Sequence, residues 1–219
     1  MVKKQYDLIV FDWDGTLADS TQLIVNAIQK ASADAGLAVP SREAASSIIG
    51  LGLNEALFEL FGNIPDKTIQ LVRQRYTSYY HDGENEIPLF ECAFEAIEIL
   101  HGRGIALGVA TGKGRNGLNR ALSLSGIGHF FHATRCVDEC FSKPHPQMII
   151  ELMDELGVTP DRTLMVGDTS FDMQMAQNAM VDRIAVGFGA HPIEMLIEYK
   201  PLAYFDQFKK LKEWLNSNV

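Results

Sequence analysis

The feature that most restricts the fold of this chain is an alternation of short apolar runs with stretches of helical spacing. The apolar runs lie at residues 6–12, 106–111, 163–167 and 183–186, with a weaker one near 132–137. Stretches in which apolar residues recur with helical spacing follow them, at residues 94–101, 116–124, 147–156, 173–179 and 208–215. Nearly continuous apolar runs are typical of strands buried on both faces, and strands that alternate with helices form parallel sheets. The pattern therefore predicts a three-layer α/β fold with a Rossmann-like parallel sheet.

One region departs from this alternation. From about residue 21 to residue 86 the apolar spacing stays helical, and no strand is expected. The first apolar residues of this region recur at four-residue intervals: Leu23, Ala27, Ala31 and Ala35. Such spacing places them on one face of a helix. We expect a small α-helical cap domain at 18–87, inserted after the first strand, and a hydrolase core domain made of 1–17 and 88–219.

The charge of the chain restricts the kinds of molecule that it is expected to bind. Lys and Arg total 19 against 28 Asp and Glu, a formal net charge of −9 at pH 7. An acidic chain without a basic patch is a poor match for nucleic acid or for an anionic membrane surface. No apolar run approaches the roughly 18–20 residues that span a bilayer, and the start of the chain lacks the features of a signal peptide. We therefore expect a cytoplasmic protein with no nucleic-acid or membrane partner.

The most specific signal is the sequence Asp12-Trp13-Asp14-Gly15-Thr16, at the end of the first predicted strand. Two carboxylates two residues apart on an extended chain face the same way and repel each other, so they require a cation or a shared proton. Packing gives no reason for them, and the glycine permits a sharp exit of the chain. We expect a functional site here, because open parallel sheets bind ligands at the carboxyl ends of their strands.

Two other segments carry polar groups that are weaker signals. Thr111 and Gly112 close the second strand, where a hydroxyl and a backbone amide can donate to phosphate oxygens. Turn or cap chemistry explains these two residues about equally well. Lys143 stands just before a helix that Pro146 is suited to begin, so its ammonium group would have a fixed position. Taken alone, Lys143 is better explained as a solvated lysine.

The last cluster is acidic. Asp168 follows the apolar run at 163–167 directly, as Asp12 follows its own run. Asp172 stands four residues later in the first turn of a predicted helix, where it could also serve only the helix dipole. Two strand-end carboxylates and a backbone carbonyl form an oxygen-only site, and such a site suits Mg²⁺.

These clusters resemble, in their order, the four motifs of the haloacid dehalogenase-like hydrolase superfamily. The resemblance rests on Asp12-x-Asp14-Gly15-Thr16, Thr111, Lys143-Pro144, and Gly167-Asp168 with Asp172. It runs nearly from end to end of the chain. It implies a Mg²⁺-dependent phosphatase that hydrolyses phosphate monoesters of small metabolites through an aspartyl-phosphate intermediate.

The helical insertion is similar to the small cap of the phosphoglycolate phosphatase and β-phosphoglucomutase branch of this superfamily. Gly50 and Gly52 resemble the cap loop of phosphoglycolate phosphatases. Thr111 is followed by Gly112 and Lys113, whereas many phosphoglycolate phosphatases have Asn after the Thr. Phosphoglycolate is therefore one candidate substrate among small phosphorylated metabolites, and we expect a monomer or a weak homodimer.

The resemblance also implies roles for individual residues. Asp12 would be the nucleophile, Asp14 the general acid and base, and Lys143 the cation that neutralises charge beside the phosphoryl group. The residues implied to bind substrate are Thr111, Gly112, Lys143, Gly50 and Gly52. The residues implied to bind Mg²⁺ are Asp12, Asp14 (through its backbone carbonyl), Asp168 and Asp172. The chemistry is coherent, since a carboxylate can accept a phosphoryl group and covalent catalysis divides hydrolysis into two displacements.

Two other functions stay open at this point. A receiver domain of a signalling system also uses a phosphorylatable Asp, further acids, a Thr and a Lys, but it would be about half as long and would lack the insertion. A sugar-phosphate mutase of the same superfamily would pass the phosphoryl group to a sugar instead of water. Asp14 argues against a dehalogenase, because displacement of a halide needs no acid.

Overall fold

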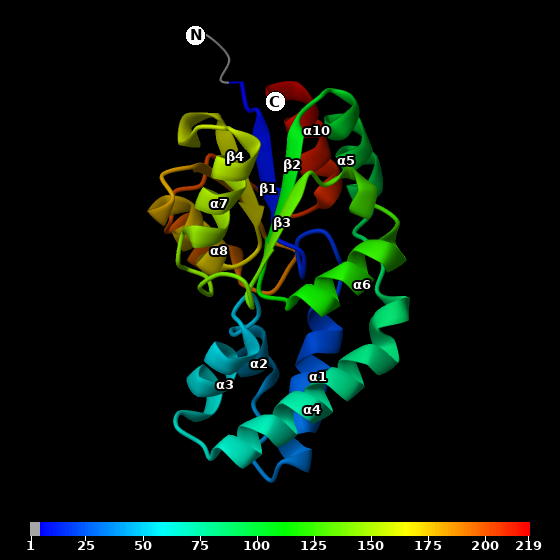
Figure 1. The fold of residues 1–219 in the computed structure, drawn as a ribbon, viewed down its shortest axis with the longest axis vertical. Coiled ribbons are helices and arrows are strands. Elements are labelled where there is room, and N and C mark those ends of the chain that lie inside the picture. The colour runs from blue at the N-terminus through cyan, green and yellow to red at the C-terminus, as the bar shows by residue number, and fades with distance from the viewer. Residues whose placement is uncertain (1–4) are drawn as a thin grey trace.

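The fold is an α/β sheet with a helical region below it, as seen in a computed structural model that describes residues 5–219 (Figure 1). Residues 1–4, which begin the predicted core segment 1–17, lie outside the described residues. Six strands form one sheet in the order β3-β2-β1-β4-β5-β6, and all neighbouring pairs are parallel. The strands are β1 (Leu8–Phe11), β2 (Ala106–Thr111), β3 (Ala133–Cys136), β4 (Thr163–Gly167), β5 (Asp182–Val186) and β6 (Ala203–Phe205).

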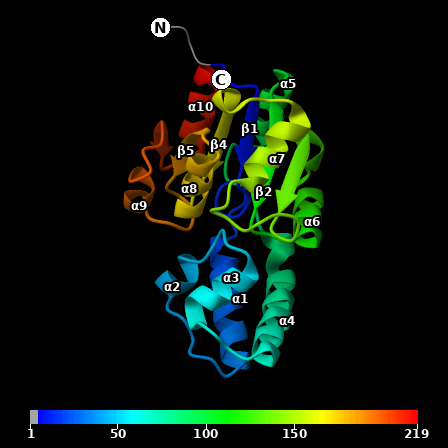
Figure 2. The same cartoon turned by 60° about the vertical axis from the view of Figure 1, so that its left-hand side comes forward.

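Helices cover both faces of this sheet, as the two views show (Figures 1 and 2). One apolar cluster joins the sheet to α5 (Ala93–Gly102), α6 (Arg115–Ser125) and α10 (Phe208–Asn218). A second cluster, on the other face, joins it to α7 (Gln147–Leu156) and α8 (Ser170–Asn178). All four residues of β1 are fully buried between these layers, which is why its sequence is continuously apolar.

The helices between β1 and α5 pack mainly on one another and lie beyond the carboxyl ends of the strands (Figure 2). They are α1 (Thr21–Asp34), α2 (Arg42–Ser46), α3 (Leu53–Phe61) and α4 (Asp66–Gly83). Their apolar residues form a separate cluster whose buried members include Val25, Ile28, Leu57 and Val72. We call this helical region the cap; its predicted boundaries at 18 and 87 remain a prediction.

The predicted three-layer α/β fold is confirmed. The strand that was not predicted is β6, a three-residue edge strand that is partly exposed and so lacks a continuous apolar run. A short helix α9 (Ile193–Ile197) and 3-10 turns at Glu84–Glu86, Gly128–Phe130 and Pro160–Arg162 complete the described elements. Within the described part of the chain, no helix is long and apolar enough to cross a membrane.

Candidate active site

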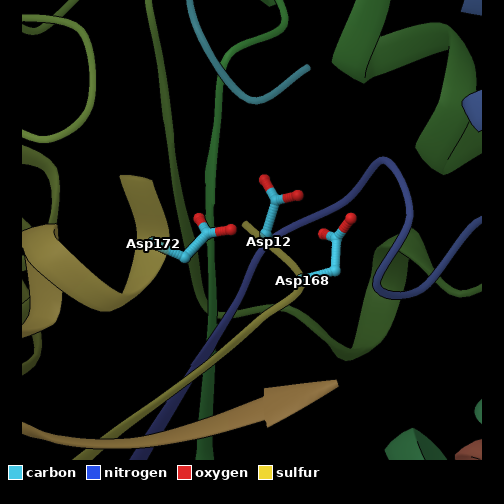
Figure 3. Close-up of side chains that lie close together, drawn as sticks. All are labelled: Asp12, Asp168 and Asp172. Atoms are coloured by element: carbon cyan, nitrogen blue, oxygen red, sulfur yellow. The ribbon is translucent and has the colours of Figure 1, made fainter. Parts of the chain in front are cut away.

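Three carboxylates converge at the carboxyl edge of the sheet (Figure 3). Asp12 follows β1, Asp168 follows β4, and Asp172 lies in the first turn of α8. Since β1 and β4 are neighbours in the sheet, the residues that follow them are brought together across about 155 residues of chain, as the pairing of Phe11 with Val166 shows. One oxygen of each carboxylate lies within 4.8 Å of the others, and all three side chains are buried.

A capping box fixes Asp172. The Thr169 side chain accepts from the Asp172 backbone N–H at 3.3 Å, while Asp172 Oδ2 accepts from the backbone N–H and the hydroxyl of Thr169 at 3.0 and 2.6 Å. This reciprocal pattern satisfies the free N–H groups at the start of α8. It leaves Oδ1 of Asp172 to face Lys143.

Lys143 is fully buried between two of the carboxylates. Its Nζ donates to Asp12 Oδ1 at 2.5 Å and to Asp172 Oδ1 at 2.7 Å. Burial lowers the pKa of Lys143, but the attraction of Asp12 and Asp172 exceeds this effect, so the pKa lies above its ordinary value. Lys143 is therefore a fixed cation at the site and not a solvated surface lysine.

The remaining oxygens at this edge are nearly all hydrogen-bonded. Asp168 Oδ1 accepts from the Thr16 hydroxyl at 2.7 Å, and Asp168 Oδ2 accepts from the Ala190 N–H at 2.7 Å. Asp12 Oδ2 is different: it is the one buried side-chain nitrogen or oxygen among the described residues without a partner. An unpartnered buried carboxylate oxygen is costly, which indicates that a ligand completes this site.

The charge balance also favours a cation. Burial raises the pKa of Asp12 well above its ordinary value, against the attraction of Lys143. Burial, and then the charge of Asp172, raise the pKa of Asp168 to about 7. Three carboxylates outnumber the one lysine, and the raised pKa values show that without a further cation the site favours bound protons. An all-oxygen donor set fits a hard cation such as Mg²⁺ in their place. Asp12, Asp168 and Asp172 are the residues that could hold it.

Asp14 points away from this group. Its Oδ1 accepts from the Ser20 hydroxyl at 2.6 Å, and its Oδ2 lies 3.0 Å from Nζ of Lys113. Its carboxylate is not among the groups that could share a metal ion in the described residues. The predicted contribution of Asp14 to metal binding concerned only its backbone carbonyl, and this stays a prediction.

A cavity of about 590 Å³ lies between the cap and the core. The predicted site residues that line it are Asp12, Asp14, Thr111, Gly112, Gly50 and Gly52. Thr111 is buried at the end of β2, where its Oγ1 accepts from the Lys113 N–H at 3.2 Å. The structure therefore brings the four motifs and the cap glycines to one place. Lys143, Asp168 and Asp172 are not among the residues that line the cavity, and Lys143 contacts Asp12.

The sequence did not identify Lys113 as a site residue. Its Nζ reaches from the core to Asp14 and also donates to the hydroxyl of Tyr80 in α4 at 2.8 Å. The ammonium lies 4.3 Å from the centre of the Tyr80 ring, a cation–π contact. The available signal was the place of Lys113 just after Thr111 and Gly112.

The site has a fixed cation among carboxylates and a cavity at the carboxyl edge of a parallel sheet. Such a site is typical of an α/β enzyme that acts on an anionic group. The model of the family "Haloacid dehalogenase-like hydrolase" matches residues 9–186 of the chain. The chain belongs to the haloacid dehalogenase-like hydrolase family. The predicted resemblance is confirmed.

Similar proteins cover almost the whole chain. A "Probable phosphatase IndB" of Dickeya dadantii is 30% identical over 93% of this chain and 91% of its own length. A "Phosphoglycolate phosphatase" of Aliivibrio fischeri is 32% identical, with coverage of 93% and 94%. The crystal structure of a "predicted phosphoglycolate phosphatase" from Haemophilus somnus 129pt superimposes with a TM-score of 0.81 and 26% identity, over 95% of this chain and 97% of that one. The predicted class of enzyme, a phosphatase of this family, is confirmed.

Proposed function

We propose that the protein is a Mg²⁺-dependent phosphatase that hydrolyses monoesters of small metabolites through a phosphoryl group carried on Asp12. The observation that carries this proposal is the unpartnered Oδ2 of Asp12, a buried residue that contacts Lys143 and lines the cavity. A carboxylate held in this way is a competent nucleophile for phosphorus. The cytoplasmic location and the monomeric or weakly dimeric state belong to the same proposal.

Two displacements complete the reaction. In the first, a carboxylate oxygen of Asp12 bonds to phosphorus, the ester P–O bond breaks, and Asp14 gives a proton to the leaving alkoxide. In the second, Asp14 takes a proton from water, the water oxygen bonds to phosphorus, and the Asp12–phosphorus bond breaks. Asp12 and Asp14 are then restored, and inorganic phosphate leaves.

Other residues hold the phosphoryl group during both steps. Lys143 offsets its negative charge next to Asp12, and Thr111 and the Gly112 amide donate hydrogen bonds to its oxygens. Asp12, the carbonyl of Asp14, Asp168 and Asp172 would hold Mg²⁺. When bound, the ion supplies positive charge that reduces the repulsion between the nucleophile and the phosphate.

The leaving-group side of the cavity favours a compact substrate with a second negative charge. Lys113 lies there, beside the proposed acid Asp14, and Arg73 of the cap lines the same cavity. Cations so placed can bind a carboxylate or phosphate on the leaving group. Phosphoglycolate is the first candidate, because a similar protein carries that activity in its name.

The test is a panel of phosphate monoesters, together with the anhydride pyrophosphate, assayed for kcat/KM with Mg²⁺, with Ca²⁺ and with EDTA. The panel contains phosphoglycolate, pyrophosphate, sugar phosphates and p-nitrophenyl phosphate. We expect turnover only with the metal, faster with Mg²⁺ than with Ca²⁺, because Ca²⁺ prefers longer bonds and more ligands. Full activity in EDTA would refute the metal site, and phosphoryl transfer between sugar hydroxyls would identify a mutase.

A further inference from the structure

The turn that follows β2 contacts the cap at a point that has no room for a side chain. A Cβ atom on Gly112 would lie 2.6 Å from the carbonyl oxygens of both Gly50 and Leu51. Ordinary contacts of such an atom begin at 3.4 Å. Both oxygens belong to the backbone, so no side-chain rotation can relieve the overlap. Gly112 is not among the residues with positive φ, so the neighbouring loop and not the turn itself demands a glycine here.

The loop that meets Gly112, residues 50–52, is held by the core on two further sides. We call it the cap loop. The N–H of Gly52 donates to the Ser142 hydroxyl at 3.0 Å, next to Lys143. A Cβ on Gly50 would lie 3.1 Å from Oγ1 of Thr169, which caps α8. The cap loop is thus enclosed by the segments that follow β2, β3 and β4, and it lines the same cavity as Asp12.

We propose that Gly112 is a specificity-determining residue: its missing side chain lets the cap loop sit low over Asp12, and this depth restricts the size of the leaving group. Any side chain at this position must raise the loop by about 0.8 Å, from 2.6 Å to 3.4 Å. The inference rests on the proposed function, because it assigns this cavity to the leaving group. A low cap loop also keeps water away from the phosphoryl group, which strengthens the contacts made there.

Gly112→Ala separates this role from phosphate binding. Alanine keeps the backbone amide that is proposed to donate to phosphate, and it adds only the atom that meets the cap loop. Gly102→Ala is the matched control: Gly102 also lacks a positive φ, lies in α5, and has no atom within 4 Å of an added Cβ. Phosphoglycolate serves as the compact ester, replaced by the best alkyl ester of the panel if it is not turned over. The bulky ester is p-nitrophenyl phosphate.

In Gly112→Ala we expect the ratio of kcat/KM for the compact ester to that for p-nitrophenyl phosphate to fall about tenfold or more, because small displacements at an active site are amplified in the rate. We also expect the amides of residues 50–54 to exchange hydrogen about tenfold faster, since exchange reports local opening. Gly102→Ala should match the wild type in both measurements.

Ser142→Ala is a second variant, in case Gly112→Ala does not fold. It frees the cap loop from the opposite side without adding an atom, and it should shift the ratio and the exchange in the same direction. Wild-type exchange and a wild-type ratio in Gly112→Ala would overturn the inference. If the wild type hydrolyses no ester, the proposed function is refuted. The exchange data then still show whether the absence of a side chain at Gly112 holds the cap loop close to the core.

Discussion

Asp12, Asp168 and Asp172 have different hydrogen-bonding environments although all three are buried carboxylates. Thr169 and Lys143 occupy both oxygens of Asp172, and Thr16 and the Ala190 amide occupy both oxygens of Asp168. Among the buried side-chain oxygens of the described residues, only Oδ2 of Asp12 has no hydrogen-bond partner. At the scale of single residues, this difference is the reason that we propose Asp12 as the nucleophile and the other two carboxylates as metal ligands.

Asp12→Asn should lower kcat by at least about 10³-fold, the usual scale for loss of an essential nucleophile. The amide has the same shape but cannot accept a phosphoryl group. Lys143 keeps Asp172 as its partner, so the fold should survive. The measurement is steady-state hydrolysis by protein whose mass has been verified, with circular dichroism as the control for folding. A variant that retains a tenth of the wild-type kcat would rule out Asp12.

Asp14→Asn should slow alkyl esters far more than aryl esters. Asp14 lines the cavity, and its carboxylate pairs with Lys113 instead of joining the other three acids, so we expect the leaving group to stand beside it. An alkoxide needs a proton as it leaves, whereas an aryl or acyl leaving group needs little help. The checks are the kcat/KM values for both types of ester.

The same variant should trap the intermediate. With an activated acyl phosphate, Asp14→Asn should still be phosphorylated on Asp12 but should lack the base that activates water. Intact-protein mass spectrometry after rapid quenching should detect the added phosphoryl mass, and Asp12→Asn serves as the negative control. Equal losses on alkyl and aryl esters, with no trapped species, would contradict the acid and base role.

The residues at the carboxyl edge could be predicted from the sequence, because strand-end position is a local property. Each of Asp12, Thr111 and Asp168 ends or follows an apolar run, and the parallel sheet brings such positions together. The ion pair between Lys113 and Asp14 could not be predicted. It depends on the side-chain direction of Asp14 and on how α4 is placed against the core, and neither leaves a sequence pattern.

At the scale of elements, the buried strands were the easiest to predict and the exposed edge the hardest. β1, β2 and β4 are covered on both faces, so burial makes them continuously apolar. β6 is half exposed and only three residues long, so it resembles a loop. The apolar spacing of α8 begins only at 173, three residues after the helix starts at 170, because the first turn holds the polar residues of the capping box; Asp172 lies in that first turn, as predicted.

The junction of β1, β4 and α8 should make the metal-free protein less stable as the pH rises. Asp168 has a raised pKa of about 7 in the folded state, against an ordinary value of 3.8. The folded state therefore binds a proton that the unfolded chain has released. This contribution is fully present below about pH 4 and is lost as the pH rises through 7.

The measurement is the Tm in EDTA from pH 4.5 to 8, with Asp168→Asn as the matched variant that cannot titrate. The Tm of the wild type should fall relative to that of Asp168→Asn as the pH increases. Mg²⁺ should raise the Tm of the wild type at pH 8, because it binds the folded state only, and should affect the variant much less. Parallel curves for both proteins would contradict the assignment.

At the scale of the whole molecule, the cavity depends on how two separately packed regions meet. The cap has its own apolar cluster, and its helices could be anticipated from spacing alone. The way the cap contacts the core could not be anticipated, because the contacts are made at two glycines. Backbone carbonyls of the cap loop approach Gly112, and the Thr169 side chain approaches Gly50. Such contacts require the absence of side chains, and a glycine in a sequence can equally mark a turn, a helix end or a bulge.

Two glycines of the cap allow the last prediction. Substrate choice should depend on how the cap loop contacts the core and not on the stability of the cap. Gly50 and Gly36 both have positive φ, at 99° and 70°, so alanine at either position should cost roughly 1–2 kcal/mol of stability. Only Gly50 faces the core, where an added Cβ meets Thr169; Gly36 faces no atom within 4 Å. Gly50→Ala should therefore lower kcat/KM about tenfold for the best alkyl ester, on the scale of a displaced reaction site, and much less for p-nitrophenyl phosphate. Gly36→Ala should lower the Tm but leave both kcat/KM values unchanged, and equal kinetic losses in the two variants would show that the cap acts only through its stability.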